Sequence, residues 1–256
     1  MKAFHGDKKI KEKYVARIKA HSKADEIVKG IYWQEGKGCA VGCTIEGDDH
    51  KRYETELGIP KIIAYLEDGL FEDMSNEEAK KFPLRFLEAI PVGADLSMVF
   101  TKLVIWEWED EKHGLRNIKE IQDNKELFDC CTGVCNLYKR HLKGEKVKDD
   151  EWEKFEELSD KIYSAEARAG AEAGAVAWAR AWARAGAWAW ARDWAVAWAR
   201  ARAWARAGAW TWARDWAVAG ARAWARAGVG AEYENQILIT ADKLIELLKE
   251  SPVPHE

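Results

Sequence analysis

The chain has 256 residues, of which 48% are hydrophobic and 33% are charged, and its formal net charge is −4. This length suits one large domain or two small ones. Arginine interrupts every apolar stretch well short of the roughly 20 residues that a transmembrane helix needs, so no membrane span is predicted. The charged N-terminal stretch also predicts no signal peptide. We therefore expect a cytoplasmic protein whose five cysteines are reduced thiols.

Residues 7–29 show the apolar spacing of an amphipathic helix. Two polar side chains, His21 and Asp25, fall on its apolar face four residues apart. Side chains with this spacing on a helix are neighbours, so we expect them to hydrogen-bond to each other.

A glycine-rich turn follows, with the sequence Gly-Lys-Gly-Cys-Ala-Val-Gly-Cys-Thr over residues 36–44. It leads into a short apolar element that begins at Cys39. Residues 48–54 then predict an N-capped helix that ends near Gly58.

Helices dominate the prediction as far as residue 165. Pro60 starts a clearly amphipathic helix, on which we expect the acidic residues to form a solvated face. Ser75 has capping-box spacing for a second, short helix, and Pro83 starts another. The remaining predicted helices cover residues 96–108, most of 117–141, and 149–165. The acidic residues of the predicted solvated face are Glu67, Asp68, Glu72 and Asp73.

Residues 165–231 form a low-complexity block in which alanine occupies nearly every odd position. The block holds eleven of the 15 tryptophans and ten arginines but no lysine. Residues 182–201 and 204–223 match at 18 of 20 positions, which gives a repeat of 22 residues. Such a repeat returns to the same face of an α-helix after six turns at about 3.67 residues per turn. Because alanine favours helices and 67 residues far exceed one strand, helices are favoured over a β-solenoid.

This block has a net charge of +6, and the remainder of the chain has −10. The opposite charges favour docking of the block on its own N-terminal domain or on another copy of the chain. Arginine with tryptophan is also suited to nucleic acid or a membrane surface, but the acidic remainder would repel phosphate.

The sequence therefore predicts an all-α protein with three parts. These are a helical N-terminal domain over residues 1–160, the Ala/Trp/Arg repeat block over 161–231, and a C-terminal helix and tail over 232–256. Signals for β-strands are scarce throughout the chain.

The motif of residues 36–44, together with residues 53–60, 66–68 and 89–97, resembles a group of uncharacterised bacterial and phage-encoded proteins. Members of that group also carry an alanine-rich block before a terminal helix similar to the one here around residues 241–244. The resemblance implies no function.

One hypothesis is a Cys-His hydrolase or transferase. The start of a helix and the neighbouring Lys37 would favour the thiolate of Cys39, and His21, oriented by Asp25, could act as its base. The plainer alternative is that His21 and Asp25 are a satisfied buried pair.

A second hypothesis is a metal site, for which zinc is the expected ion. The first candidate ligands are His21, Cys39, Cys43 and His50. The second set is the four thiolates of Cys39, Cys43, Cys131 and Cys135, which form two pairs with the same spacing. Alternatively, the cysteines are plain core thiols and the protein has no cofactor.

A third hypothesis is a pocket for a small anionic ligand at Gly36, Lys37 and Gly38, with His50 and Tyr53 nearby. Taken together, the sequence favours a non-catalytic binding or assembly protein that forms a homo-oligomer through the repeat block. The alternatives are the Cys39 enzyme and nucleic-acid or membrane-surface binding by the block.

Overall fold

The computed structural model describes residues 1–152, 154–155, 158 and 230–254, and its described part is all-α apart from one small hairpin, as predicted. Contacts within the chain divide it into two units, one of residues 1–100 with 233–256 and one of residues 101–232. The repeat block lies in the part of the chain that the structure does not describe. The predicted boundaries at residues 160 and 231 lie in or beside that part. Among the described residues, no helix combines the length and apolar character needed to cross a membrane.

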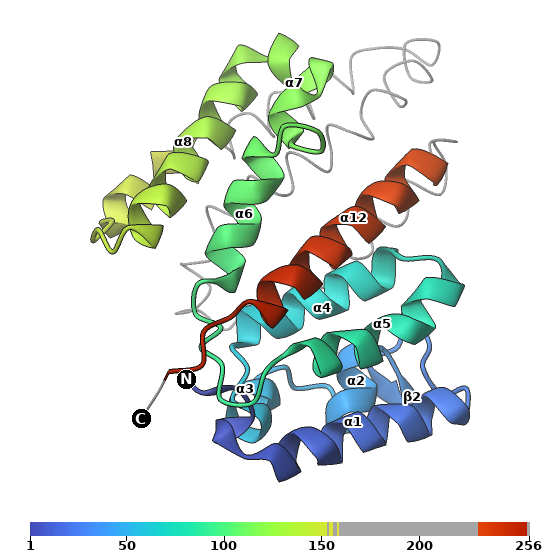
Figure 1. The fold of residues 1–256 in the computed structure, drawn as a ribbon. Coiled ribbons are helices and arrows are strands. Elements are labelled where there is room, and N and C mark those ends of the chain that lie inside the picture. Colours follow the sequence, from blue (N-terminus) through green and yellow to red (C-terminus); the bar gives the residue numbers. More distant parts are fainter. Residues whose placement is uncertain (153, 156–157, 159–229, 255–256) are drawn as a thin grey trace. The chain divides into compact units, whose positions relative to one another are not determined.

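The first unit contains short and long helices around the central helix α2 (Figure 1). Every residue of α2 is buried, and α2 contacts α1, α4 and α5. Its apolar residues face neighbours on several sides, which is why a helix of six residues is stable there. The elements of this unit are η1 (Ala3–Gly6), α1 (Lys8–Lys23), β1 (Trp33–Gln34), β2 (Lys37–Gly38), α2 (Ala40–Ile45), α3 (Arg52–Leu57), α4 (Lys61–Asp73), α5 (Asn76–Ala89), the start of α6 (Val99–Glu109), and α12 (Gly230–Lys249) from residue 233 onward.

Helix α1 begins after its N-cap Asp7, as predicted, but it ends at Lys23 rather than near residue 29. Asp25 has a φ of 56°, in the left-handed region, which a continuing helix does not allow. The predicted hydrogen bond between His21 and Asp25 is therefore wrong, because Asp25 lies beyond the end of the helix.

The glycine-rich turn predicted around residue 36 is the turn of an antiparallel hairpin. Trp33 pairs with Gly38, and Gln34 pairs with Lys37. Glu35 and Gly36, at the turn, both have positive φ, which is the conformation that tight two-residue hairpins require.

The end of α3 and the start of α4 follow the prediction, but α3 begins only at Arg52 and lacks the side-chain N-cap predicted within residues 48–54. Gly58 caps α3 in the left-handed conformation, and Pro60 is the N-cap of α4. The two short helices predicted from Ser75 and Pro83 are instead one continuous helix, α5, with Pro83 inside it. Pro83 removes one helical hydrogen bond, but Phe82 and Phe86 are fully buried and their burial keeps both halves in one helix.

The described part of the second unit is also helical. Its core includes Trp108 of α6, which packs against Phe128 with ring centroids 5.2 Å apart. Asn124 caps α8 by accepting a hydrogen bond from the Leu127 N–H. The further elements of this unit are η2 (Leu115–Asn117), α7 (Lys119–Asp123) and α8 (Lys125–Leu142).

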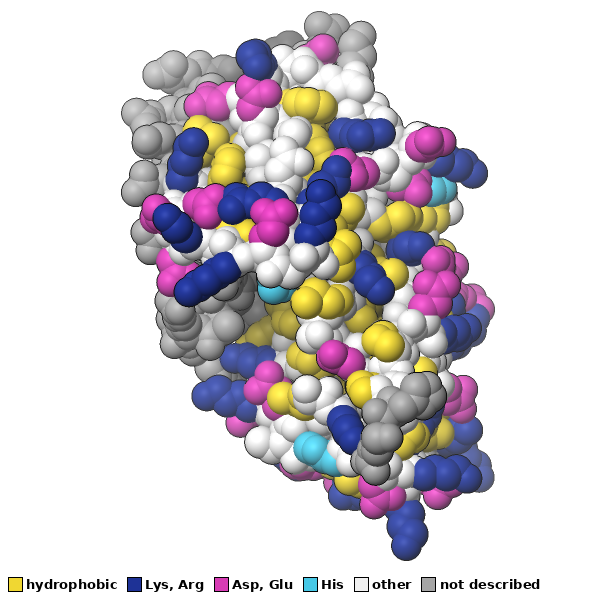
Figure 2. All heavy atoms as spheres, turned by 60° about the vertical axis from the view of Figure 1, so that its left-hand side comes forward, with side chains coloured by type: hydrophobic (Ala, Val, Ile, Leu, Met, Phe, Trp, Pro, Cys, Tyr) yellow, Lys and Arg dark blue, Asp and Glu magenta, His cyan; other side chains and the backbone are white. Residues whose placement is uncertain are grey.

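Surface charges of both signs are mixed. On the face drawn in Figure 2, Lys and Arg side chains lie among Asp and Glu side chains. Exposed ion pairs such as that of Lys81 with Glu77 and Glu78 are examples of this mixing. Ion pairs of this kind contribute little to stability, so the fold depends on its buried core.

Candidate functional site

Two glycines allow the loop before the hairpin to approach the start of α2. A Cβ atom added at Gly42 would lie 1.5 Å from the carbonyl oxygen of Tyr32, and one added at Gly38 would lie 2.2 Å from the same oxygen. Only glycine permits so close an approach of two backbones. The spacing of Gly38 and Gly42 in the motif therefore fixes the backbone of Tyr32 against α2.

Cys39 is the N-cap residue of α2, as the motif predicts. Its Sγ accepts a hydrogen bond from the Gly42 N–H at 3.4 Å and lies 3.8 Å from the Tyr32 carbonyl oxygen. The side chain is almost completely buried, with 1% of its surface exposed.

Asp68 and Glu72 lie one turn apart on α4 and reach the same place. One carboxylate oxygen from each and the Sγ of Cys39 all lie within 4.8 Å of one another. Glu72 accepts hydrogen bonds from the Gly30 N–H at 3.0 and 2.9 Å. We call Cys39, His50, Asp68 and Glu72 the Cys39 cluster.

His50 completes the cluster from the loop before α3. Its Nε2 lies 3.4 Å from Oδ2 of Asp68. The imidazole stacks on Tyr65, with ring centroids 4.6 Å apart and planes at 24°, and meets the edge of Tyr32 at 5.6 Å. The other oxygen of Asp68, Oδ1, is buried and has no hydrogen-bond partner among the described residues.

Burial and the neighbouring Asp68 weaken the acidity of Cys39 and Glu72. Burial, followed by the charge of Asp68 and a side-chain hydrogen bond with Asp68, raises the pKa of the Cys39 thiol well above its usual value. Burial raises the pKa of Glu72 to about 7, and the charge of Asp68 adds to the effect. Thus the ionised forms of Cys39 and Glu72 are disfavoured where the two side chains meet Asp68.

A buried polar pair lies next to the cluster. Tyr53 donates a hydrogen bond of 2.7 Å to Glu67, and both side chains are fully buried. Burial raises the pKa of both groups. Tyr53 is therefore part of the core, with its hydroxyl already bonded to Glu67, and its role as a ligand contact stays a prediction.

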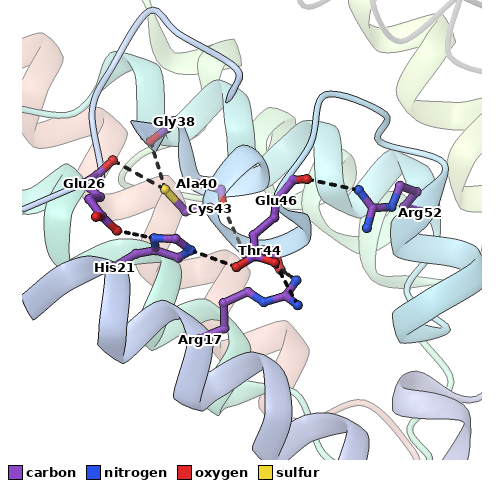
Figure 3. Close-up of polar contacts among 9 residues, drawn as sticks. All are labelled: Arg17, His21, Glu26, Gly38, Ala40, Cys43, Thr44, Glu46 and Arg52. Carbon is purple, nitrogen blue, oxygen red and sulfur yellow. Dashed lines mark hydrogen bonds and ion pairs between the residues drawn. The ribbon is translucent and has the colours of Figure 1, made fainter. Parts of the chain in front are cut away.

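The predicted base His21 belongs to a different group of side chains, which Figure 3 shows together with Cys43 of α2. Its Nδ1 lies 2.6 Å from Glu26 and its Nε2 lies 3.7 Å from Glu46. Asp25 is exposed and pairs with Lys80 at 2.5 Å. The hypothesis that Asp25 orients His21 is thus wrong, because Glu26 takes that place.

The same cluster contains Cys43, whose Sγ donates to the carbonyl oxygens of Gly38 at 3.2 Å and Glu26 at 3.6 Å. Arg17 contacts Glu46 at 3.2 Å and the Thr44 carbonyl oxygen at 2.9 Å. Each of these groups has partners. We call Arg17, His21, Glu26, Cys43 and Glu46 the His21 cluster.

Of the four residues predicted to share a metal, Cys39 and His50 thus join one cluster and His21 and Cys43 the other. Burial raises the pKa of the Cys43 thiol to about 12, as expected for a core thiol. All five cysteines are free, as predicted. The four-thiolate site stays a prediction, since Cys131 and Cys135 lie in the second unit.

Two backbone N–H groups beside the hairpin turn already have partners. The Gly38 N–H donates to the Glu26 carbonyl oxygen at 3.1 Å, and the Cys39 N–H donates to that of Ile31 at 2.7 Å. Lys37 is exposed, and Gly36 is partly exposed at the hairpin turn. The N–H groups of Gly38 and Cys39 are thus already used, while the anionic ligand at Gly36, Lys37 and Gly38 stays a prediction.

Sequence reasoning missed the carboxylates of α4. Glu67 and Asp68 were expected on a solvated face, but their side chains are 0% and 7% exposed. The spacing contained this signal. Ile63 and Ala64, which lie four residues before Glu67 and Asp68, are buried, and so is Phe71, four residues after Glu67. Glu67 and Asp68 thus continue the apolar stripe of the helix.

Comparison of the chain with family models, with curated proteins and with solved structures finds no match.

Proposed function

We propose that the protein binds a divalent metal ion of the zinc type through Cys39, Asp68 and Glu72. The observation that carries the proposal is the convergence of three ligand atoms from two helices within 4.8 Å. Even at that full separation, a point equidistant from all three would lie only about 2.8 Å from each atom. Zinc bonds are about 2.3 Å to sulfur and about 2.0–2.2 Å to oxygen, so small side-chain movements complete the site.

The unpartnered oxygen of Asp68 supports a ligand at this place. Buried polar atoms in native proteins normally have partners, and a buried carboxylate oxygen without one is costly. His50 occupies Oδ2 of Asp68, so Oδ1 is the oxygen that a metal ion would take.

Electrostatics also favour a cation here. Burial raises the pKa of Cys39 and of Glu72, and the neighbouring charge of Asp68 raises both further. A divalent cation reverses that penalty, because it stabilises the thiolate and the carboxylates together and displaces their protons.

The donor atoms indicate which ion binds. Mg²⁺ and Ca²⁺ prefer oxygen ligands, whereas thiolate sulfur selects softer ions. One sulfur with two carboxylates fits Zn²⁺, with Co²⁺ as a spectroscopic substitute.

The same environment argues against the Cys39 enzyme. A nucleophilic cysteine needs a lowered pKa and access, but Cys39 is buried and its pKa is raised. The proposed base His21 pairs with Glu26 and belongs to the other cluster. Binding is therefore the better supported function.

Cobalt titration of metal-free protein under reducing conditions tests this proposal. We expect one equivalent of Co²⁺ to produce a thiolate charge-transfer band, which zinc then abolishes. Cys39→Ser should lose the band, and Asp68→Asn should weaken binding by more than about 100-fold, beyond the roughly 10–100-fold typical of residues that only support a ligand.

Cys43→Ser is the matched control, because Cys43 lies four residues later, is equally buried, and hydrogen-bonds only to backbone in the described structure. It should keep the cobalt band. A band that depends on Cys43 as much as on Cys39, or no band at all, would refute the site.

We also propose that the chain self-associates through residues 165–231, which lie outside the described residues. The support is the charge difference between this block, at +6, and the remainder, at −10. The test is the mass in solution, which should exceed 29.1 kDa and fall when block tryptophans become alanine. A monomer at all concentrations contradicts this proposal. The five free cysteines support a reducing, cytoplasmic location.

A further inference from the structure

We propose that an ion held by Cys39, Asp68 and Glu72 keeps one coordination position open, and that this position takes neutral nitrogen or oxygen donors in preference to small anions. This inference rests on the proposed metal site. It adds the class of ligand that the site binds.

The described residues supply three ligands and no fourth. The group of ligand atoms within 4.8 Å comprises only Cys39, Asp68 and Glu72 among the described histidines, cysteines and carboxylates. His50 lies outside this group, where it stacks on Tyr65 and directs Nε2 to Oδ2 of Asp68. Tetrahedral zinc with three protein ligands carries an exchangeable fourth ligand, whereas structural zinc usually has four protein ligands.

The direction of access is inferred from the burial of the surrounding side chains. Cys39 and Asp68 are buried, so the protein closes the site beneath them. Glu72, Tyr32 and Tyr65 are only half-buried. A ligand would therefore reach the ion on the side of Glu72 and the two tyrosine rings, which are suited to a flat, neutral ring such as imidazole.

Charge determines the kind of ligand. One thiolate and two carboxylates carry three negative charges, so a divalent ion leaves the centre at −1. Beyond the centre, the charges of Lys29 and Asp73 act on Glu72 in opposite directions. An incoming anion is repelled by this centre, but a neutral imidazole, amide or alcohol is not.

Ligand titration of the cobalt-loaded, full-length protein tests the inference. Imidazole should shift the visible bands of Co²⁺ without removing the metal, which is checked by metal analysis after dialysis. Azide should bind more weakly than imidazole, after each affinity is corrected for that of the same ligand for aqueous Co²⁺. The expected ratio is about fivefold or more, which corresponds to one unit charge at about 4 Å in water.

The outcomes separate this inference from the metal site itself. If cobalt binds with a thiolate band but neither ligand shifts its spectrum, the position is closed and the inference fails while the metal site stands. If azide binds as tightly as imidazole after correction, the preference for neutral donors is wrong. If no cobalt binds, the proposed function fails first. Cys43→Ser, which leaves the cluster intact, should behave like the wild type.

Discussion

The two polar clusters beside α2 contain the same kinds of residue but differ in how many of their bonds are satisfied. Each has a histidine, a cysteine and two carboxylates. In the His21 cluster, both ring nitrogens of His21 face carboxylates, Cys43 donates to two carbonyl oxygens, and Arg17 pairs with Glu46. In the Cys39 cluster, Asp68 keeps a buried oxygen without a partner in the described structure. Residue type alone therefore does not define a site.

Charge separates the two clusters as clearly as hydrogen bonding does. Arg17 brings a positive charge to the His21 cluster and offsets its carboxylates. The Cys39 cluster has no arginine or lysine within its ion pairs, and the pKa values of Cys39 and Glu72 are raised. The His21 cluster thus contains its own positive charge and serves the fold. The Cys39 cluster contains acidic groups whose charge a bound cation would offset.

The largest expected effect is a loss of stability from a substitution in α2, the helix that both clusters share. Gly42→Ala places a Cβ 1.5 Å from the Tyr32 carbonyl oxygen, so the loop or α2 must move. We expect a loss of about 3 kcal/mol or more in unfolding free energy, measured by chemical denaturation. Gly36→Ala is the control, since nothing lies within 4 Å and only its positive φ is strained, at about 1–2 kcal/mol. Equal losses in the two variants would contradict the close approach.

The next effect concerns pH. The folded pKa of Glu72, about 7, lies above the unfolded value of about 4.3. In metal-free protein, Glu72 thus contributes stability that is present in full below pH of about 4.3 and is lost as pH rises through about 7. Glu72→Gln should remove this pH dependence, so its stability relative to the wild type should rise by about 4 kcal/mol between these limits. Parallel pH profiles of the two proteins, measured by denaturation, would show that Glu72 is not perturbed.

A smaller effect is expected at His50, which orients a ligand without being one. His50→Ala should weaken cobalt binding by about 10–100-fold, because Asp68 loses the partner that fixes Oδ2. His50→Asn retains an N–H donor and should restore part of the affinity. His21→Ala, in the other cluster, should leave cobalt affinity unchanged. If His21→Ala weakens binding as much as His50→Ala does, the two clusters are not functionally distinct.

The smallest effect is expected at the surface of the His21 cluster. The side chain of Glu46 is 47% exposed where it pairs with Arg17 and His21. Glu46→Gln should therefore cost no more than about 1 kcal/mol and should not alter cobalt affinity. Thermal unfolding and a cobalt titration of the same sample measure both. A large loss of metal affinity here would place the metal in the His21 cluster instead of the Cys39 cluster.

Local signals in the sequence predicted much of the fold. Gly58 and Pro60 marked the ends of their helices correctly, and Cys39 was correctly placed at the start of α2. These features depend on a few neighbouring residues, so the sequence contains them. Pro83 was wrongly predicted to start a new helix, because the burial of Phe82 and Phe86 outweighs the hydrogen bond that the proline removes.

The site was harder to predict, because its ligands come from separate helices. Asp25 was chosen as the partner of His21 by helical spacing, but the helix ends two residues earlier and Glu26 takes the position. Asp68 and Glu72 meet Cys39 only because α4 packs against α2, which is a tertiary contact. The repeat block, which is the most unusual part of the sequence, lies outside the described residues, and its role stays a prediction.

X-ray absorption spectroscopy at the zinc edge of the zinc-loaded protein tests the central claim most directly, since it counts the atoms around the ion. The Cys39 cluster predicts one sulfur at about 2.3 Å and the remaining ligands as oxygen or nitrogen at about 2.0–2.2 Å. Cys39→Ser should remove the sulfur shell, and Cys43→Ser should retain it. A shell of two or more sulfurs, or one without sulfur, would contradict a site built from Cys39, Asp68 and Glu72.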